Sequence, residues 1–375
     1  MNRFNDGSLG DPAFPIAWRI GDFEMYQAGT IVREGGRTYY DVPLEKPWDI
    51  PAEDHEREFR KRPIIDAHTI LLGKGNIPDL VAAQERVGIG RSVITVVGDR
   101  FVLELGDLTR GEELMDAALA AVSSHPDRFI AFGNIDFEGF TDSSWADRQR
   151  HRFDRLWEKG VRGIKGHMGQ HAVIRGFNAM LGLPEHHSFL TDPSVRTIWE
   201  HVGEKGGIVF QHLGDAPFNL KWYPHDKLLA EYEEMIGTNP DTLFVSPHLA
   251  SSVDDMGRLN RWLDTYPHLH VTVSGLITVF RPTTAFTAEG AQRFRRFLID
   301  RQDRIIFGSD AGMGRQYNVE TIYYIYRRWL EDAMGTSFEI FFDETRSIHA
   351  LGLPEEVLAK LYYGNLLRLL PDWSS

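Results

Sequence analysis

The most constraining feature of this 375-residue chain is a repeat that begins at Pro63, in which short apolar runs alternate with longer amphipathic segments. The apolar runs are almost continuously hydrophobic, which is typical of parallel strands buried on both faces. They occupy residues 63–69, 92–98, 128–136, 161–167, 207–212, 242–248, 269–275 and 304–310. A strand that alternates with a helix eight times predicts a closed (β/α)8 TIM barrel more naturally than an open doubly wound sheet.

The segments between these strands are expected to form helices that cover the barrel, at residues 77–87, 112–122, 145–157, 194–204, 226–236, 253–264 and 289–299. In the fourth of them, Asp192 can cap the helix and Pro193 suits its first position. Its apolar face comprises Val195, Ile198, Trp199 and Val202. Further helical patterns at residues 320–329, 338–350 and 355–370 predict the last barrel helix and extra C-terminal helices.

Residues 1–62 precede the repeat and form a predicted N-terminal extension to a barrel domain at residues 63–375. Two alternating runs within residues 24–42 are joined at Glu34, Gly35 and Gly36, a pattern that predicts a β-hairpin. The hairpin could cap the barrel, contribute to a homo-oligomer, or form a simple surface ribbon.

Charge and composition exclude several classes of partner. Lys and Arg total 41 against 54 for Asp and Glu, a formal charge of -13, and no basic stripe is present, so nucleic acid is not expected. The chain has no cysteine, which excludes thiolate ligands and cysteine nucleophiles. The N-terminus lacks the apolar run of a secretory signal, and no stretch approaches the roughly 20 apolar residues of a membrane span. We therefore expect a cytoplasmic protein without a membrane partner that acts on a small molecule.

Ionisable residues lie at the ends of five predicted strands: His68, Lys165, His212, His248 and Asp310. The C-terminal rim of a barrel is where such enzymes hold their reactants, and a strand interior is otherwise an expensive place for a polar side chain. Imidazoles and a carboxylate at one mouth suit a divalent cation that activates water. Convergence of all five groups favours a functional site over separate structural roles.

The same segments carry a resemblance to a known family. They are IIDAHT, HPDRFIAFGNI, GIKGH, VFQHLGD, PDTLFVSPHLA, IIFGSDAG and LAKLYYGNLLRLL, in that order. Across roughly Pro63 to Leu370 the chain resembles the amidohydrolase-related family, in the branch that includes aminocarboxymuconate-semialdehyde decarboxylase, resorcylate decarboxylases and lactonases. The resemblance implies a metal, zinc or manganese, bound by His68, His212 and Asp310. It also implies that His248 polarises the substrate or serves as acid and base.

One position departs from the family pattern, because Ile70 stands where a second histidine is expected two residues after His68. Three interpretations remain open. Three protein ligands and water could still hold a metal. Another residue could replace the lost ligand, with Asp66, His167 and His171 as the candidates. The barrel could also work without metal, through acid–base and oxyanion groups alone.

Four residues in loops after the strands are candidates for contact with the substrate. Arg100, Arg281 and Arg315 each follow a strand end and could bind a carboxylate in a bidentate arrangement. Trp222 lies among aromatic residues that would suit an apolar or aromatic substrate.

These observations predict an enzyme that hydrolyses an amide, lactone or similar acyl bond of a small organic molecule. In that mechanism Asp310 accepts a proton from the attacking water, while His248 and Lys165 stabilise the oxyanion. The alternative is a non-oxidative decarboxylase of a small aromatic or unsaturated carboxylic acid. A second alternative, suggested by Ile70, is a barrel that binds a small molecule without turnover.

Overall fold

The computed structural model describes residues 61–71, 77–96, 110–169, 178, 181–184, 186–213, 225–253, 255–277, 287–313, 319–341 and 345–373, and the backbone of four short strands between residues 17 and 41. The substrate-contact candidates Arg100, Trp222, Arg281 and Arg315 lie outside the described residues, as does His171. Their assigned roles stay predictions.

The predicted (β/α)8 barrel is confirmed. Its strands are β5 (Ile65–Leu71), β6 (Arg91–Val96), β7 (Phe129–Gly133), β8 (Val161–Gly169), β9 (Ile208–Leu213), β10 (Leu243–Ser246), β11 (Leu269–Thr272), β12 (Ile305–Ile306) and β13 (Ala311–Met313). Neighbouring strands follow the chain order from β5 to β12 and pair in parallel, and β13 returns to pair with β5.

The eighth barrel strand consists of β12 and β13, and the segment between them closes the barrel. On one side, the amide of Val273 donates to the carbonyl of Ile306 at 3.2 Å. On the other side, the amide of Ala67 donates to the carbonyl of Phe307 at 3.1 Å. The residues before Asp310 therefore bridge the seventh strand and the first, which brings the two ends of the sheet together.

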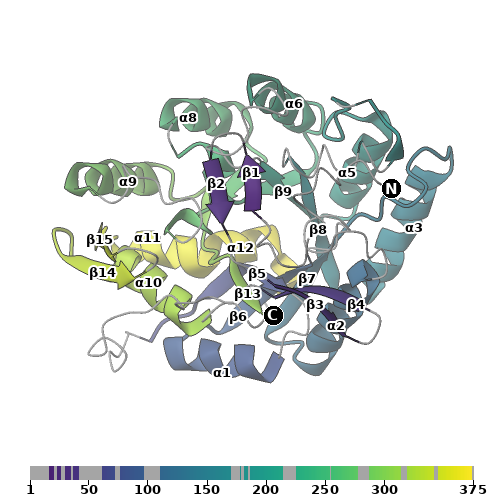
Figure 1. Cartoon of the computed structure of the whole chain (residues 1–375). Coiled ribbons are helices and arrows are strands. Elements are labelled where there is room, and N and C mark those ends of the chain that lie inside the picture. The colour runs from purple at the N-terminus through teal and green to yellow at the C-terminus, as the bar shows by residue number, and fades with distance from the viewer. Residues whose placement is uncertain are drawn as a thin grey trace.

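Helices surround the strands in the order that the sequence predicts (Figure 1). They are α1 (Ile77–Val87), α2 (Arg110–Ser124), α3 (Trp145–Glu158), α5 (Pro193–Glu204), α6 (His225–Gly237), α8 (Met256–Thr265), α9 (Ala288–Asp300) and α10 (Val319–Glu331). At α5 the Asp192 side chain accepts from the amide of Ser194 at 2.8 Å, and Pro193 opens the helix, as expected. Its four apolar residues are all buried, so the capping and periodicity argument holds there.

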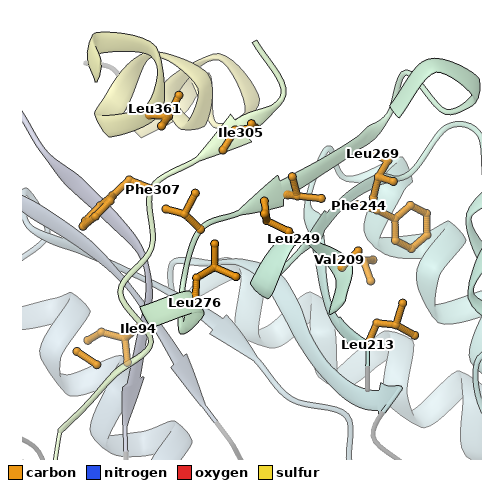
Figure 2. Close-up of a cluster of buried hydrophobic side chains, with 14 of the residues drawn as sticks. Ile94, Val209, Leu213, Phe244, Leu249, Leu269, Leu276, Ile305, Phe307 and Leu361 are labelled. Atoms are coloured by element: carbon orange, nitrogen blue, oxygen red, sulfur yellow. The ribbon is translucent and has the colours of Figure 1, made fainter. Parts of the chain in front are cut away.

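The strands are buried on both faces, which explains their nearly continuous apolar sequences. In β9, Val209 packs outward into the cluster between strands and helices that Figure 2 shows. Its neighbours Ile208 and Phe210 belong instead to a second cluster, which contains the barrel interior. Leu366 and Trp373, near the C-terminus, join this inner cluster, and Arg91 at the start of β6 donates to the Trp373 carbonyl at 2.5 Å. The C-terminal segment thus closes the barrel at the N-terminal ends of its strands.

The helix predicted at residues 338–350 is wrong. The segment forms two antiparallel strands, β14 (Ser337–Phe341) and β15 (Thr345–His349). Phe338 pairs directly with Ile348, and both side chains are buried. The physical reason is that burial of this cross-strand pair outweighs a weak helical periodicity. Ile348 is β-branched and favours a strand, and its neighbour Ser347 is a poor helix former.

The last predicted helix, residues 355–370, is present as α11 (Glu355–Ala359), a π-helical turn η4 (Lys360–Gly364) and α12 (Asn365–Leu369), followed by a 3-10 turn η5 (Pro371–Trp373). The carbonyl of Leu361 in the π-helical turn accepts from the amide of Phe307 at 2.8 Å. The Asn365 side chain donates to the carbonyls of Gln302 at 2.6 Å and Ile305 at 2.7 Å. This helix therefore fixes the eighth barrel strand from outside.

In the N-terminal region the predicted hairpin is confirmed, because β3 (Thr30–Glu34) and β4 (Arg37–Asp41) pair antiparallel. A second antiparallel pair, β1 (Ala17–Ile20) and β2 (Phe23–Tyr26), precedes it. The domain boundary at residue 62 stays a prediction. Within the described residues, no helix has the length and apolar character needed to cross a membrane.

Candidate active site

Five ionisable side chains from separate strands converge at one end of the barrel. Lys165 Nζ lies 3.0 Å from His68 Nε2, which in turn lies 3.2 Å from Asp310 Oδ1. His248 Nε2 is 3.9 Å from Asp310 Oδ2, and the rings of His212 and His248 have centroids 4.8 Å apart. The four basic residues are buried, and Asp310 keeps a small exposed fraction.

The candidate metal ligands differ by one residue from the predicted set. Among the described residues, His68, His248 and Asp310 have ligand atoms that all lie within 4.8 Å of one another. The sequence predicted His212 in place of His248. His212 lies beside this group, and its ring centroid is 4.8 Å from that of His248 and 6.1 Å from that of His167. The ligand role given to His212 stays a prediction.

A hydrogen bond to a backbone carbonyl fixes which nitrogen of His248 carries the proton. His248 Nδ1 lies 2.6 Å from the carbonyl oxygen of Ser274, which only accepts, so Nδ1 donates and Nε2 keeps its lone pair. His68 Nε2 lies near both the Lys165 ammonium, which donates, and Asp310 Oδ1, which accepts; in the tautomer that accepts from Lys165, His68 Nδ1 donates to Ser274 Oγ at 2.9 Å. In that tautomer of His68, both imidazoles direct an Nε2 lone pair into the site.

Burial keeps these imidazoles neutral. It lowers the pKa of His68 well below the usual histidine value, and the charge of Lys165 lowers it further. Burial also lowers the pKa of His248, with a smaller contribution from His212. His167 is affected in the same way, first by burial and then by Lys165. Neutral imidazole is the form that binds a metal or accepts a proton.

Asp66 positions the site rather than entering it. Its Oδ1 accepts from the amides of His68 and Ser309, each at 2.9 Å. Its Oδ2 accepts from the hydroxyls of Thr69 at 2.9 Å, Ser309 at 2.5 Å and Tyr323 at 2.7 Å. Because both oxygens are occupied by donors, Asp66 is a poor replacement for the lost ligand. The carboxylate instead ties the strand that carries His68 to the residue before Asp310.

His248 begins a left-handed turn, α7 (His248–Ser251), in which all four residues have positive φ, between 47° and 58°. Such a conformation costs roughly 1–2 kcal/mol for each residue other than glycine. The surroundings impose it, because the Ser274 carbonyl binds His248 and the Leu213 carbonyl accepts from the Ser251 hydroxyl. Strain of this kind is concentrated at functional sites. It turns His248, two residues beyond the end of β10, toward Asp310.

The strain in this turn can be measured by replacing Ala250 with glycine. Ala250→Gly removes one buried methyl group, which costs about 0.8 kcal/mol, but it also relieves the left-handed strain. We expect the free energy of unfolding to change by less than about 0.5 kcal/mol. The matched control Ala118→Gly, also fully buried but within the right-handed helix α2, should lose about 2 kcal/mol. Equal losses in the two variants, measured by chemical denaturation, would contradict the strain.

Ser274 and Gly275, which the sequence analysis did not single out, shape the wall beside His248. Gly275 has φ +65°, and a Cβ built on it would lie 2.6 Å from His248 Nδ1 and 2.9 Å from Asp310 Oδ2. Only glycine leaves room for both groups. A serine–glycine pair directly after an apolar strand was the signal available in the sequence, but loops after strands commonly contain such pairs.

Ile70, where the family pattern has histidine, is partly exposed near the mouth of the barrel. It pairs with Thr95 of β6 and Gly312 of β13. Its side chain supplies no ligand, and among the candidate replacements His167 is buried beside His212.

The fold and site together define a (β/α)8-barrel enzyme with imidazoles and a carboxylate gathered at one end of its strands. A family model described as Amidohydrolase matches residues 103–371. The chain therefore belongs to the amidohydrolase family, which confirms the resemblance seen in its motifs. No curated protein sequence matches the chain.

Solved structures with the same fold include an uncharacterised TIM-barrel protein from Bordetella bronchiseptica, at 13% identity and a TM-score of 0.55, covering 84% of this chain and 100% of that one. A 2,6-dihydroxybenzoate decarboxylase from Rhizobium matches at 12% identity and a TM-score of 0.51, covering 84% and 99%. An amidohydrolase from Burkholderia multivorans, solved with bound zinc, matches at 13% identity and a TM-score of 0.50, covering 83% and 99%. These likenesses confirm the barrel.

Proposed function

We propose that this enzyme is a metal-dependent hydrolase that cleaves an acyl bond, in an amide, lactone or similar group, of a small organic substrate. The observation that carries the proposal is the arrangement of Asp310 between two imidazoles, with Oδ1 toward His68 and Oδ2 toward His248. Two neutral nitrogen donors and one carboxylate suit Zn²⁺ or Mn²⁺, and three protein ligands leave a coordination position open for reactants. His68, His248 and Asp310 would hold the ion.

A divalent cation at this position would polarise the scissile carbonyl and make water a better nucleophile near neutral pH. Asp310 is the general base of the proposal, because it is the carboxylate of the cluster and is partly exposed. Lys165, buried at the centre, would donate to the oxyanion that forms at the carbonyl oxygen. His212 lies beside His248 and would contact the substrate.

Non-oxidative decarboxylation is the second candidate, and the charge of the site favours it. Lys165 and a metal ion held by the candidate ligands would together attract the carboxylate of a substrate. The imidazoles of His68 and His248 are neutral and would not add to this attraction. The 2,6-dihydroxybenzoate decarboxylase from Rhizobium has this fold. In this reaction a protonated group must deliver a proton to carbon as CO2 leaves.

The products distinguish the two reactions. In one assay, purified enzyme is incubated with lactones and N-acyl amino acids, and the release of acid is measured. In the other, it is incubated with hydroxybenzoates, and the release of CO2 is measured. We expect acid release that falls at least about tenfold after chelation and returns when Zn²⁺ or Mn²⁺ is added. CO2 release without acid release would favour the decarboxylase. Turnover that chelation leaves unchanged would contradict a metal-dependent reaction of either kind.

A further inference from the structure

Lys165 is a buried lysine in direct contact with a candidate metal ligand. Its side chain is only 1% exposed, and its Nζ lies over the Phe210 ring, 4.4 Å from the ring centroid. The same nitrogen lies 3.0 Å from His68 Nε2, a hydrogen-bond distance. The ammonium is therefore held within the site by the face of the Phe210 ring and by a nitrogen of a candidate ligand.

This contact uses the lone pair that a metal would need. The ammonium has three donors and no acceptor, so with Nδ1 as the protonated nitrogen of His68, Lys165 donates to His68 Nε2. His68 Nδ1 is directed at Ser274 Oγ and Ser274 Oγ lies 2.6 Å from Thr272 Oγ1, so the ring is held from its other edge. One lone pair cannot serve both an ammonium and a divalent cation. The two positive charges would also repel each other at this distance.

We propose that Lys165 is a built-in competitor of the metal: its ammonium occupies the His68 position of the metal site and must leave it before a divalent cation binds there. The inference rests on the proposed metal site at His68, His248 and Asp310. In the metal-free enzyme Lys165 holds His68 close to Asp310 in place of a metal. Once displaced, the ammonium stays within the buried pocket, where it can donate to a substrate oxygen. Binding of the metal therefore also frees the Lys165 ammonium to donate to the oxyanion.

The metal affinity of two Lys165 variants tests this inference. Lys165→Met keeps an unbranched side chain of nearly the same length without the charge, and Lys165→Gln keeps a polar end. Each is stripped with a chelator, checked by circular dichroism, and titrated with Zn²⁺ by calorimetry beside the wild-type protein. The control is Lys159→Met, which removes the same charge from the exposed end of α3. We expect at least about tenfold tighter binding in the Lys165 variants and unchanged binding in the control.

Affinity that is unchanged or weaker in both Lys165 variants would overturn the inference, and weaker binding would mean that Lys165 supports the metal. Zinc binding that is equal in all proteins overturns only the competition and leaves the proposed metal site standing. An absence of binding in all of them overturns both.

A structure of the wild-type zinc complex gives a readout that needs no substitution. We expect Lys165 Nζ to lie beyond 3.5 Å from His68 Nε2, and a retained hydrogen bond contradicts the proposal.

Discussion

Replacement of Asp310 by asparagine is expected to lower kcat by about a thousandfold or more. The substitution removes a candidate metal ligand and the proposed proton acceptor together, and general acid–base catalysis alone contributes roughly 10²–10⁴. The isosteric amide leaves the shape of the site unchanged. Asp310 also retains some exposure at the rim, so its change should cost little core packing. Steady-state kinetics with the best substrate from the acid-release panel would measure the effect.

The matched control for this variant is Asp127→Asn, which makes the same change at an exposed turn between α2 and β7. It should retain wild-type kcat. Thermal unfolding of both variants would show whether the fold is intact. A folded Asp310→Asn enzyme with kcat within about tenfold of wild type would rule out the role of Asp310 as general base.

Replacement of Gly275 by alanine is expected to disable the site without touching any ionisable group. The new methyl group would lie far inside van der Waals distance of His248 Nδ1 and Asp310 Oδ2, at 2.6 and 2.9 Å. Either His248 or Asp310 must move to make room for this methyl group. Changes around metal ligands commonly alter affinity by about tenfold or more, so we expect at least about a tenfold loss of metal affinity. The positive φ and the overpacking should also lower the free energy of unfolding by about 2–4 kcal/mol.

Gly206→Ala separates the two contributions. Gly206 has φ +70°, and a Cβ built on it meets no atom within 4 Å, so alanine there carries only the left-handed backbone cost. This control should lose about 1–2 kcal/mol and keep full metal affinity. If Gly275→Ala behaved like Gly206→Ala in both measurements, the close packing of Gly275 against His248 and Asp310 would not control the site.

The sequence was sufficient to predict the barrel because burial on both faces gives each strand a nearly continuous apolar run. In β9, for example, Val209 and Phe210 face opposite clusters, and both must be hydrophobic. The prediction was wrong at residues 338–350, where the structure has two antiparallel strands. There, the cross-strand contact of Phe338 with Ile348 decides the structure, and a local periodicity cannot reveal a pairing partner.

The convergence of His68, Lys165, His212, His248 and Asp310 was predictable for a topological reason. Parallel strands in a barrel place their C-terminal ends at one rim, so residues at strand ends meet whatever their separation in the chain. The sequence did not reveal which histidine would face Asp310. That depends on the left-handed turn at His248–Ser251, whose residues carry no glycine signal and whose conformation is imposed by contacts from Leu213 and Ser274.

Nor did the sequence reveal the supporting groups. Ser274 and Ser309 are common loop residues, and their roles follow from atoms supplied by distant segments: Ser274 binds both His68 and His248, and Ser309 binds Asp66. Asp66 could be read from the sequence as a replacement ligand. In the structure it is surrounded by donors, because the first and eighth strands lie side by side.

The account depends most on a divalent cation bound between His68, His248 and Asp310. Its most direct test is an anomalous difference map from crystals of the wild-type protein grown with Zn²⁺ and measured at the zinc absorption edge. We expect one peak per chain, about 2.0–2.2 Å from the two Nε2 atoms and a carboxylate oxygen of Asp310. A peak bound by His167 and His212 without His68, or a zinc-soaked crystal with no peak in the barrel, would contradict the account.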